Sequence, residues 1–250
     1  KFASKKILLL DSEIKKTNDR TWCFWDKPNG DYENLVNKKW NTAVFANYNY
    51  SRDLDLNPYQ YKMVQGLDFY NYIFGIISKQ ENIEFLNQNV VSFQEENDGV
   101  SVKTETENFT CKKLFNSIFN PKEVLSQEKY PLLQQHFIGW KIKTSEPVFT
   151  PEKATFMDFS VAQKGNTRFM YVLPFSKTEA LLEYTLFSKE LLTKEEYEIE
   201  IEKYIQKLGI QNYTILEKEV GTIPMTCYPF WKHNTKNVIN IGTAGGWTKA

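Results

Sequence analysis

The sequence has few of the residues that build metal and redox sites. It contains 3 cysteines and 2 histidines among 250 residues. Cys23, Cys111 and Cys227 lie far apart and are odd in number, without the paired spacing of zinc or redox motifs. His136 and His233 likewise lack ligand spacing, and no Ser-His-Asp triad is indicated. The sequence therefore favours reduced thiols in a cytosolic protein and predicts no metal site.

A net charge and long hydrophobic runs are also missing. Lys plus Arg and Asp plus Glu each number 31, so no overall field attracts nucleic acid or an anionic membrane surface. No apolar run approaches the roughly 18 to 20 residues that span a bilayer. The first residues also lack the apolar region of a signal peptide. We therefore expect no nucleic-acid partner and no membrane crossing.

A glycine-rich phosphate-binding turn is absent near the N-terminus. Residues 6–11 form a short apolar run closed by Asp11, the pattern of a buried parallel strand. In dinucleotide-binding folds such an acid binds the adenosine ribose, and a G-x-G-x-x-G turn precedes it by about 20 residues. An ordinary turn or cap is the alternative for Asp11. Because the chain begins too late for this turn and stops directly after glycines, we expect both ends to be cut.

The residues that are present predict an α/β first half and a largely antiparallel second half. Residues 66–80 have apolar side chains at helical spacing, and β-type residues, a meander and a buried strand follow up to residue 119, which we expect to return to the first sheet. Later, Thr193 and Glu196 form a capping box for a helix that Gly209 ends. Long strands are predicted at 155–159, 169–173 and 180–187.

A glycine-rich turn follows the last predicted strand, residues 237–241. It contains Gly242, Gly245 and Gly246, at the expected start of a helix. Such turns let backbone amides approach a phosphate or a flavin. The three glycines are therefore candidates for cofactor binding, with an ordinary turn as the alternative.

Several segments, in order, resemble the flavoprotein-type lycopene cyclases of bacteria. The most distinctive is an F-x-Y-x-x-P-F segment at residues 169–175 that is followed by L-E-x-T at residues 182–185. The other segments are residues 18–25, 135–158, 223–226 and 242–247. The resemblance therefore covers nearly the whole chain.

The resemblance implies an α/β fold of the FAD-dependent, hydroxylase-like type, with two dinucleotide-binding folds. Such a fold has a parallel sheet with a meander and a mostly antiparallel substrate-domain sheet. We expect an FAD-binding domain at residues 1–125 plus 220–250, without its N-terminal glycine-rich βα unit, and a substrate domain at 126–219. The implied cofactor is reduced FAD without net redox change, and NAD(P)H serves as its reductant. Asp11 and Arg20 are the cofactor candidates of the first half, for ribose and for pyrophosphate or ribityl contacts.

The implied reaction closes β-ionone rings on the ψ-ends of lycopene, which is an isomerisation of the intramolecular lyase type. It needs a proton delivered to a terminal double bond and a proton lost from carbon. Glu183 is the candidate acid, because burial keeps a carboxyl group protonated near neutrality. It shares a strand face with Leu181, Thr185 and Phe187. The alternative is that this face is exposed to solvent and that Glu183 has no role.

Four further residues are candidates for the site. Asp158 is expected to orient Glu183 or to take up the leaving proton, with structural hydrogen bonding as the alternative. Trp22, Phe24 and Tyr171 are substrate-pocket candidates that would stabilise a cation, although at least two of them are expected in the core instead.

Two other functions fit the same patterns. A hydroxylase or a geranylgeranyl or polyprenyl reductase of this fold would change the mass of its substrate by oxygen or hydrogen. A non-catalytic carotenoid- or lipid-binding protein would keep the pocket without the chemistry. For the cyclase we expect a cytoplasmic protein in peripheral contact with the membrane that dissolves its substrate.

Overall fold

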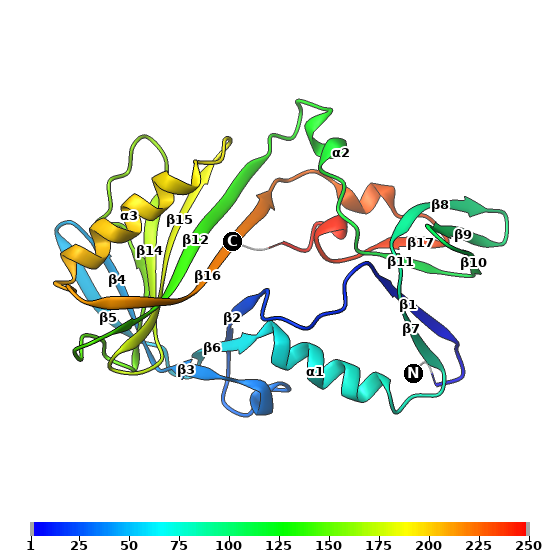
Figure 1. Ribbon diagram of the computed structural model, residues 1–250. Coiled ribbons are helices and arrows are strands. Elements are labelled where there is room, and N and C mark those ends of the chain that lie inside the picture. The colour runs from blue at the N-terminus through cyan, green and yellow to red at the C-terminus, as the bar shows by residue number, and fades with distance from the viewer. Residues whose placement is uncertain (1–2, 249–250) are drawn as a thin grey trace. The chain divides into compact units, whose positions relative to one another are not determined.

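The computed structural model describes residues 3–248, and the chain forms two units that alternate along the sequence (Figure 1). Unit 1 comprises Lys1–Thr17, Leu67–Leu132 and Thr226–Ala250. Unit 2 comprises Asn18–Gly66 and Leu133–Met225. Each unit is therefore assembled from segments that lie far apart in the sequence.

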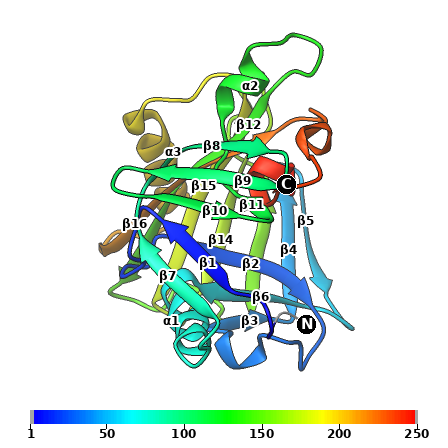
Figure 2. The same cartoon turned by 90° about the vertical axis from the view of Figure 1, so that its right-hand side faces the viewer.

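Unit 1 combines parallel strand pairs with an antiparallel meander. β1 (Ile7–Asp11) pairs with β7 (Ile83–Asn87), and β11 (Leu114–Asn116) pairs with β17 (Val238–Asn240), both in parallel. The remaining elements are α1 (Gly66–Ile77), β8 (Val90–Glu96), β9 (Gly99–Thr104), β10 (Asn108–Cys111), α2 (Pro121–Leu125) and the 3-10 helices η2 (Phe230–His233) and η3 (Gly242–Gly245). Strands β8, β9 and β10 form the meander, which Figure 2 shows from the front.

The predicted helix and strands of this half are present, but one predicted pairing is wrong. We expected the chain to return from the meander to the first sheet, and β11 instead hydrogen-bonds to β17. The side-chain amide of Asn116 (Nδ2) also donates to Asn240 Oδ1 at 2.9 Å, which supports the register of this strand pair. The meander packs on the same small core, because Val100, Val102 and Val238 are buried together.

Unit 2 is built on a seven-stranded sheet in the order β16-β12-β15-β14-β13-β4-β5. Its strands are β4 (Thr42–Asn47), β5 (Tyr50–Asp55), β12 (Leu133–Thr144), β13 (Lys153–Asp158), β14 (Arg168–Pro174), β15 (Glu179–Ser188) and β16 (Tyr213–Met225). All neighbours are antiparallel except β13 and β4. The predicted, mostly antiparallel sheet is thus confirmed.

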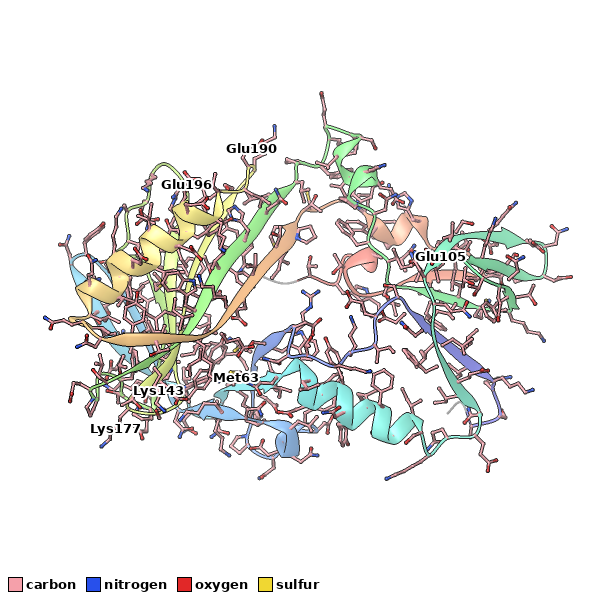
Figure 3. All side chains as sticks on the ribbon, in the orientation of Figure 1. Met63, Glu105, Lys143, Lys177, Glu190 and Glu196 are labelled. Atoms are coloured by element: carbon pink, nitrogen blue, oxygen red, sulfur yellow. The ribbon has the colours of Figure 1, made fainter. Side chains whose placement is uncertain are left out.

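Different layers cover the two faces of this sheet. On one face lies α3 (Lys194–Lys207), whose Ile201 and Ile205 are buried against Leu182 and Leu186 of β15 (Figure 1). The other face carries a three-stranded sheet in the order β2-β6-β3, with β2 (Thr21–Asp26), β3 (Lys38–Trp40) and β6 (Gln60–Gln65). Figure 3 labels Met63 of β6, which is buried between the two sheets together with Leu181 of β15.

The observed units differ from the predicted domain boundaries. Residues 18–66 belong to unit 2, because β4 pairs with β13 and because Trp40 and Met63 pack against the seven-stranded sheet. Unit 2 also extends to Met225, since β16 pairs with β12 as far as Leu133. Among residues 3–248, no helix is both long and apolar enough to cross a membrane.

The predicted capping box of α3 is present and gives a test of local stability. The Glu196 amide donates to Thr193 Oγ1 at 3.4 Å, and the Thr193 amide donates to Glu196 Oε2 at 2.7 Å. Thr193→Ala removes one of these bonds, so we expect the free energy of unfolding to fall by about 1 kcal/mol. Urea titration measures it, with the exposed Thr214→Ala as the control. An equal loss in both variants would contradict this role of the cap.

Candidate active site

Glu183 lies in the middle of β15, on the face of the sheet that α3 does not cover. Its neighbours on that face, Leu181 and Thr185, are both buried. Thr185 Oγ1 donates a hydrogen bond to Glu183 Oε1 at 2.7 Å. The Glu183 side chain is itself only partly exposed. This face is therefore an interior surface, and the alternative of a solvent-exposed Glu183 is wrong.

A second carboxyl group, that of Glu219, lies beside Glu183. Gly139 in β12 pairs with Glu183 on one side and with Glu219 of β16 on the other. A Cβ atom on Gly139 would lie 3.0 Å from Glu219 Cγ and 3.1 Å from Leu181 Cδ1. Because that atom is absent, the two carboxyl groups meet above Gly139 and share a hydrogen bond. Thr21 Oγ1 donates to the far oxygen, Glu219 Oε2, at 2.9 Å.

Burial governs the protonation of this carboxyl pair, Glu183 and Glu219. Burial, followed by the charge of Glu219, raises the pKa of Glu183 from 4.5 to about 8, although the Thr185 hydroxyl opposes this shift. Burial also raises the pKa of Glu219, which hydrogen bonds from Thr21 and Glu183 partly offset. Two carboxylates this close do not readily ionise together. The pair therefore keeps one proton near neutral pH, and Glu183 carries it.

Aromatic rings continue from Glu183 across the sheet. Tyr171 of β14 pairs with Glu183 on the side away from Gly139. Its ring centroid is 5.7 Å from that of Phe156, which in turn lies 5.1 Å from Trp25 and 5.5 Å from Tyr61. Tyr171, one of the substrate-pocket candidates, thus lies next to Glu183. Such rings present negative faces that can stabilise a nearby positive charge.

The two phenols and the thiol that lie beside the carboxyl pair stay neutral at pH 7. Burial raises the pKa of Tyr61 well above its ordinary value, and it also raises the pKa of Tyr171. Burial raises the pKa of the Cys23 thiol as well, although a hydrogen bond with Tyr61 opposes it. The carboxyl pair is consequently the acid of this layer.

Strand β2 presents different residues to the site from those that we expected. Side chains alternate between the two faces of a strand, so Thr21, Cys23 and Trp25 share one face. Thr21 binds Glu219 and Trp25 packs on Phe156, so this face meets the seven-stranded sheet. Trp22 and Phe24 consequently lie on the opposite face.

That opposite face carries an ion cluster. Phe24 pairs with the fully buried Lys62, whose Nζ lies 3.1 Å from Asp26 Oδ2 and 2.5 Å from Glu33 Oε2. Trp22 and Phe24 therefore do not share the face that meets Glu219, and their role in a substrate pocket stays a prediction. The β2 segment does reach the site, but neighbouring residues of a strand point to opposite faces. Thr21, Cys23 and Trp25 therefore meet the seven-stranded sheet in place of Trp22 and Phe24.

Asp158 lies on the α3 side of the sheet, away from Glu183. Tyr204 of α3 donates its hydroxyl to Asp158 Oδ2 at 2.7 Å, and Lys207 Nζ lies 3.5 Å from the same oxygen. Burial opposes the charge of Asp158, but hydrogen bonds from Ser160 and Tyr204 lower its pKa overall. The expectation that Asp158 orients Glu183 is wrong, because the residue holds α3 against the opposite face.

The two cofactor candidates of the first half fall into different units. Asp11 ends the parallel strand β1 of unit 1, and its Oδ1 accepts a hydrogen bond from the Glu13 amide at 2.9 Å. Arg20 belongs to unit 2, where its Nε lies 3.9 Å from Asp19 Oδ2. The structure therefore keeps Asp11 at a cofactor-type strand end but does not bring Arg20 into the same unit.

The three candidate glycines lie in the turn η3 after the parallel strand β17. Gly242 has a φ of +57°, and a Cβ atom there would meet no atom within 4 Å. A Cβ atom on Gly245 would lie 2.5 Å from the carbonyl oxygen of Asn240, and one on Gly246 would lie 2.7 Å from the Phe230 ring. Packing within the turn thus accounts for Gly245 and Gly246, whereas Gly242 leaves the backbone open to a ligand.

A cavity of about 210 Å³ adjoins this turn within unit 1. Its lining includes Asn116 and Asn240, which form an amide pair, and the rings of Phe119 and Phe230. A cavity lined by both polar groups and aromatic rings suits a heteroaromatic ligand. The cavity therefore adds to the case for a cofactor at η3.

Glu219 was not among the residues predicted for the site. It lies in a run of charged residues, Glu217 to Glu219, that reads as a solvated strand face. Only the register of β16 against β12 places it next to Glu183. Gly139 of β12 offers one signal, because a glycine inside a strand often marks a close approach.

Comparison with known proteins identifies the family. The profile of the family described as "Lycopene cyclase protein" matches residues 3–250. The chain belongs to the lycopene cyclase family. The predicted resemblance is thereby confirmed. A stretch of 54 residues is 43% identical to lycopene beta-cyclase of Paracoccus sp. (strain N81106 / MBIC 01143), and it covers 22% of this chain and 14% of that protein.

Solved flavoenzyme structures share the fold of this lycopene cyclase family member. A geranylgeranyl bacteriochlorophyll reductase-like protein from Thermoplasma acidophilum has a TM-score of 0.65 at 12% identity, over 98% of this chain and 66% of its own. The flavin-dependent brominase Bmp2 has a TM-score of 0.64 at 12% identity, over 97% of this chain and 67% of its own. An HpxO variant from Klebsiella pneumoniae complexed with FAD has a TM-score of 0.62 at 11% identity, over 96% of this chain and 74% of its own.

These likenesses confirm the predicted α/β fold of FAD-dependent, hydroxylase-like enzymes. At 11% to 12% identity they concern the fold alone. The chain spans 66% of the reductase-like protein and matches 14% of the Paracoccus cyclase.

The raised pKa of Glu183 predicts that stability depends on pH. The folded protein holds a proton on Glu183 up to about pH 8, whereas the unfolded chain loses it near pH 4.5. Since the folded state binds more protons in this window, its free energy of unfolding falls as pH rises through it. Urea titrations from pH 5 to 8.5 should show a smaller fall for Glu183→Gln. The control, Glu179→Gln on the same strand, keeps the wild-type slope, and an unchanged slope in Glu183→Gln would refute the assignment.

The thiols should differ in reactivity, because the thiolate is the reactive form. Cys227 is exposed, whereas burial raises the pKa of Cys23 and of Cys111. Iodoacetamide at pH 8 should modify Cys227 first and Cys23 last, as followed by peptide mass spectrometry. In urea all three should react at similar rates. Modification of folded Cys23 as fast as Cys227 would contradict its burial.

Proposed function

We propose that the protein is a lycopene β-cyclase that closes β-ionone rings on lycopene by acid-base chemistry without net oxidation. The observation that carries this proposal is the carboxyl pair. Glu183 is a protonated acid at neutral pH, on an interior face that continues into aromatic rings. Protonation of an alkene requires an acid of this kind, held away from bulk water.

The proposed reaction uses Glu183 as the general acid. Glu183 transfers its proton to the terminal double bond, and the neighbouring alkene attacks the resulting carbocation to close the ring. A ring carbon then loses a proton, so the product has the formula of the substrate and the enzyme is an isomerase. Tyr171 and Phe156 support the positive charge through their ring faces.

The residues of unit 1 fit a bound FAD. Asp11 ends a parallel strand as a ribose ligand does, and Gly242 offers open backbone at the turn after β17. The amide pair of Asn116 and Asn240 lines the adjoining cavity. When bound, reduced FAD supplies an electron-rich ring that stabilises positive charge without net redox change, and NAD(P)H keeps it reduced.

The substrate class sets the proposed location. A linear carotenoid dissolves in the bilayer, so the cyclase must take it from the membrane surface. We therefore propose peripheral contact with the membrane from the cytoplasm. Trp231 and Trp247 of unit 1 are 68% and 69% exposed, and tryptophans at the surface of a protein suit a membrane interface.

The deciding experiment compares pigments in lycopene-accumulating cells. The full-length protein should convert lycopene to a ring-closed product of unchanged mass, and Glu183→Gln should lower the yield at least a hundredfold, the order of a general acid's contribution. Glu179→Gln, the same change in the same strand, should keep wild-type yield. Chromatography with mass spectrometry gives both readings.

The other outcomes distinguish the competing functions. A product that gains oxygen or hydrogen would indicate a hydroxylase or a polyprenyl reductase of this fold. Unaltered lycopene bound equally by wild type and Glu183→Gln would indicate a carotenoid-binding protein. Either result would exclude the cyclase.

A further inference from the structure

Glu219 has contacts that a surface carboxylate would not need. It is held on one side by Thr21 Oγ1 at 2.9 Å and on the other by the hydrogen bond with Glu183. Both contacts depend on the empty space above Gly139, since a Cβ there would also lie 3.2 Å from Glu219 Oε1. Three separate strands, β2, β12 and β15, therefore converge to hold this one carboxyl group.

Glu219 also lines a small hollow with polar and apolar walls, which Glu183 does not line. The hollow has a volume of about 20 Å³, which is room for one water molecule. Polar groups on its wall include Asn18, Thr21, Gln65 and Lys141. Glu219 therefore stands between the hollow and Glu183, so a proton that enters by the hollow meets Glu219 first.

The groups that face the carboxyl pair are few and of known charge. Tyr171 of β14, Tyr61 of β6 and Cys23 of β2 are neutral at pH 7 because burial raises the pKa of each. On β16, the charge of Glu217 raises the pKa of Glu219 further. On β12, Lys141 lies near the hollow and directs its Nζ to the Phe175 ring at 5.1 Å. Glu219 is thus the nearest negative charge to Glu183.

We propose that Glu219 is the positioning residue of the cyclisation acid: it shares one proton with Glu183 across Gly139 and returns a proton to it from the hollow. This inference rests on the proposed cyclase function. At rest the ionised Glu219 accepts the hydrogen bond of protonated Glu183. After Glu183 has protonated the substrate, a proton passes from water in the hollow through Glu219 to Glu183. The proton that the ring carbon loses to solvent balances the one taken up.

The first test is the pH profile of lycopene cyclisation by the full-length protein, with lycopene in detergent micelles and reduced flavin. Glu219→Gln removes the charge that keeps Glu183 protonated, so the alkaline limb should move down by at least one pH unit. Activity at pH 8 should then fall at least about fivefold more than activity at pH 6. Gly139→Ala should produce a shift in the same direction by separating the two groups. Glu179→Gln, the control, should leave the profile in place.

The second test does not depend on cyclisation. Infrared titration of the protein should show a protonated-carboxyl band near pH 7 that is absent in Glu183→Gln and titrates at lower pH in Glu219→Gln. If both variants lose activity equally at every pH and the band of Glu219→Gln does not move, Glu219 is merely structural and the proposal is overturned. If the band moves as expected but lycopene is not cyclised, the shared proton stands, whereas the cyclase function and the role of Glu219 in it fail.

Discussion

Two carboxyl groups meet above Gly139, and the free-energy cost of burying their charge shapes the chemistry around them. An isolated buried carboxylate is strongly disfavoured, and a second one beside it adds repulsion, so a shared proton is the stable arrangement. The neighbouring hydroxyls of Thr21 and Thr185 each satisfy one acid. The phenols and the thiol of the same layer remain neutral. One proton is therefore localised beside the aromatic rings of the same face.

The rest of unit 2 keeps this pair in place from both sides. On the far face, α3 is fixed by its apolar residues and by the contact of Tyr204 with Asp158. On the near face, Lys62 joins β6 to Asp26 and Glu33 inside the three-stranded layer. Since neither layer can shift without breaking buried contacts, the carboxyl groups sit on a rigid support, as an acid that acts at one atom requires.

Sequence patterns predicted the elements well and the faces less well. Apolar periodicity and the Thr193 cap predicted the helix and strands of both halves, and the L-E-x-T segment drew attention to Glu183. Glu219, by contrast, becomes visible only through strand register, which no local pattern in a charged run specifies. For the same reason the sequence does not show which face of β2 meets the seven-stranded sheet, where Cys23 and Trp25 lie in place of Trp22 and Phe24. Asp158 was misplaced because a strand alone does not say which face a helix will cover.

The alternation of the two units along the chain has a consequence for biosynthesis. During translation β4 leaves the ribosome long before β13, the strand that pairs with it in parallel. Until then the edge of β4 that later pairs with β13 is open, and exposed edges invite pairing with other chains. Long-range pairing of this kind also slows folding. The interior that holds the acid therefore closes only after β16 has been synthesised, which leaves a long interval in which chaperones can bind the open strands.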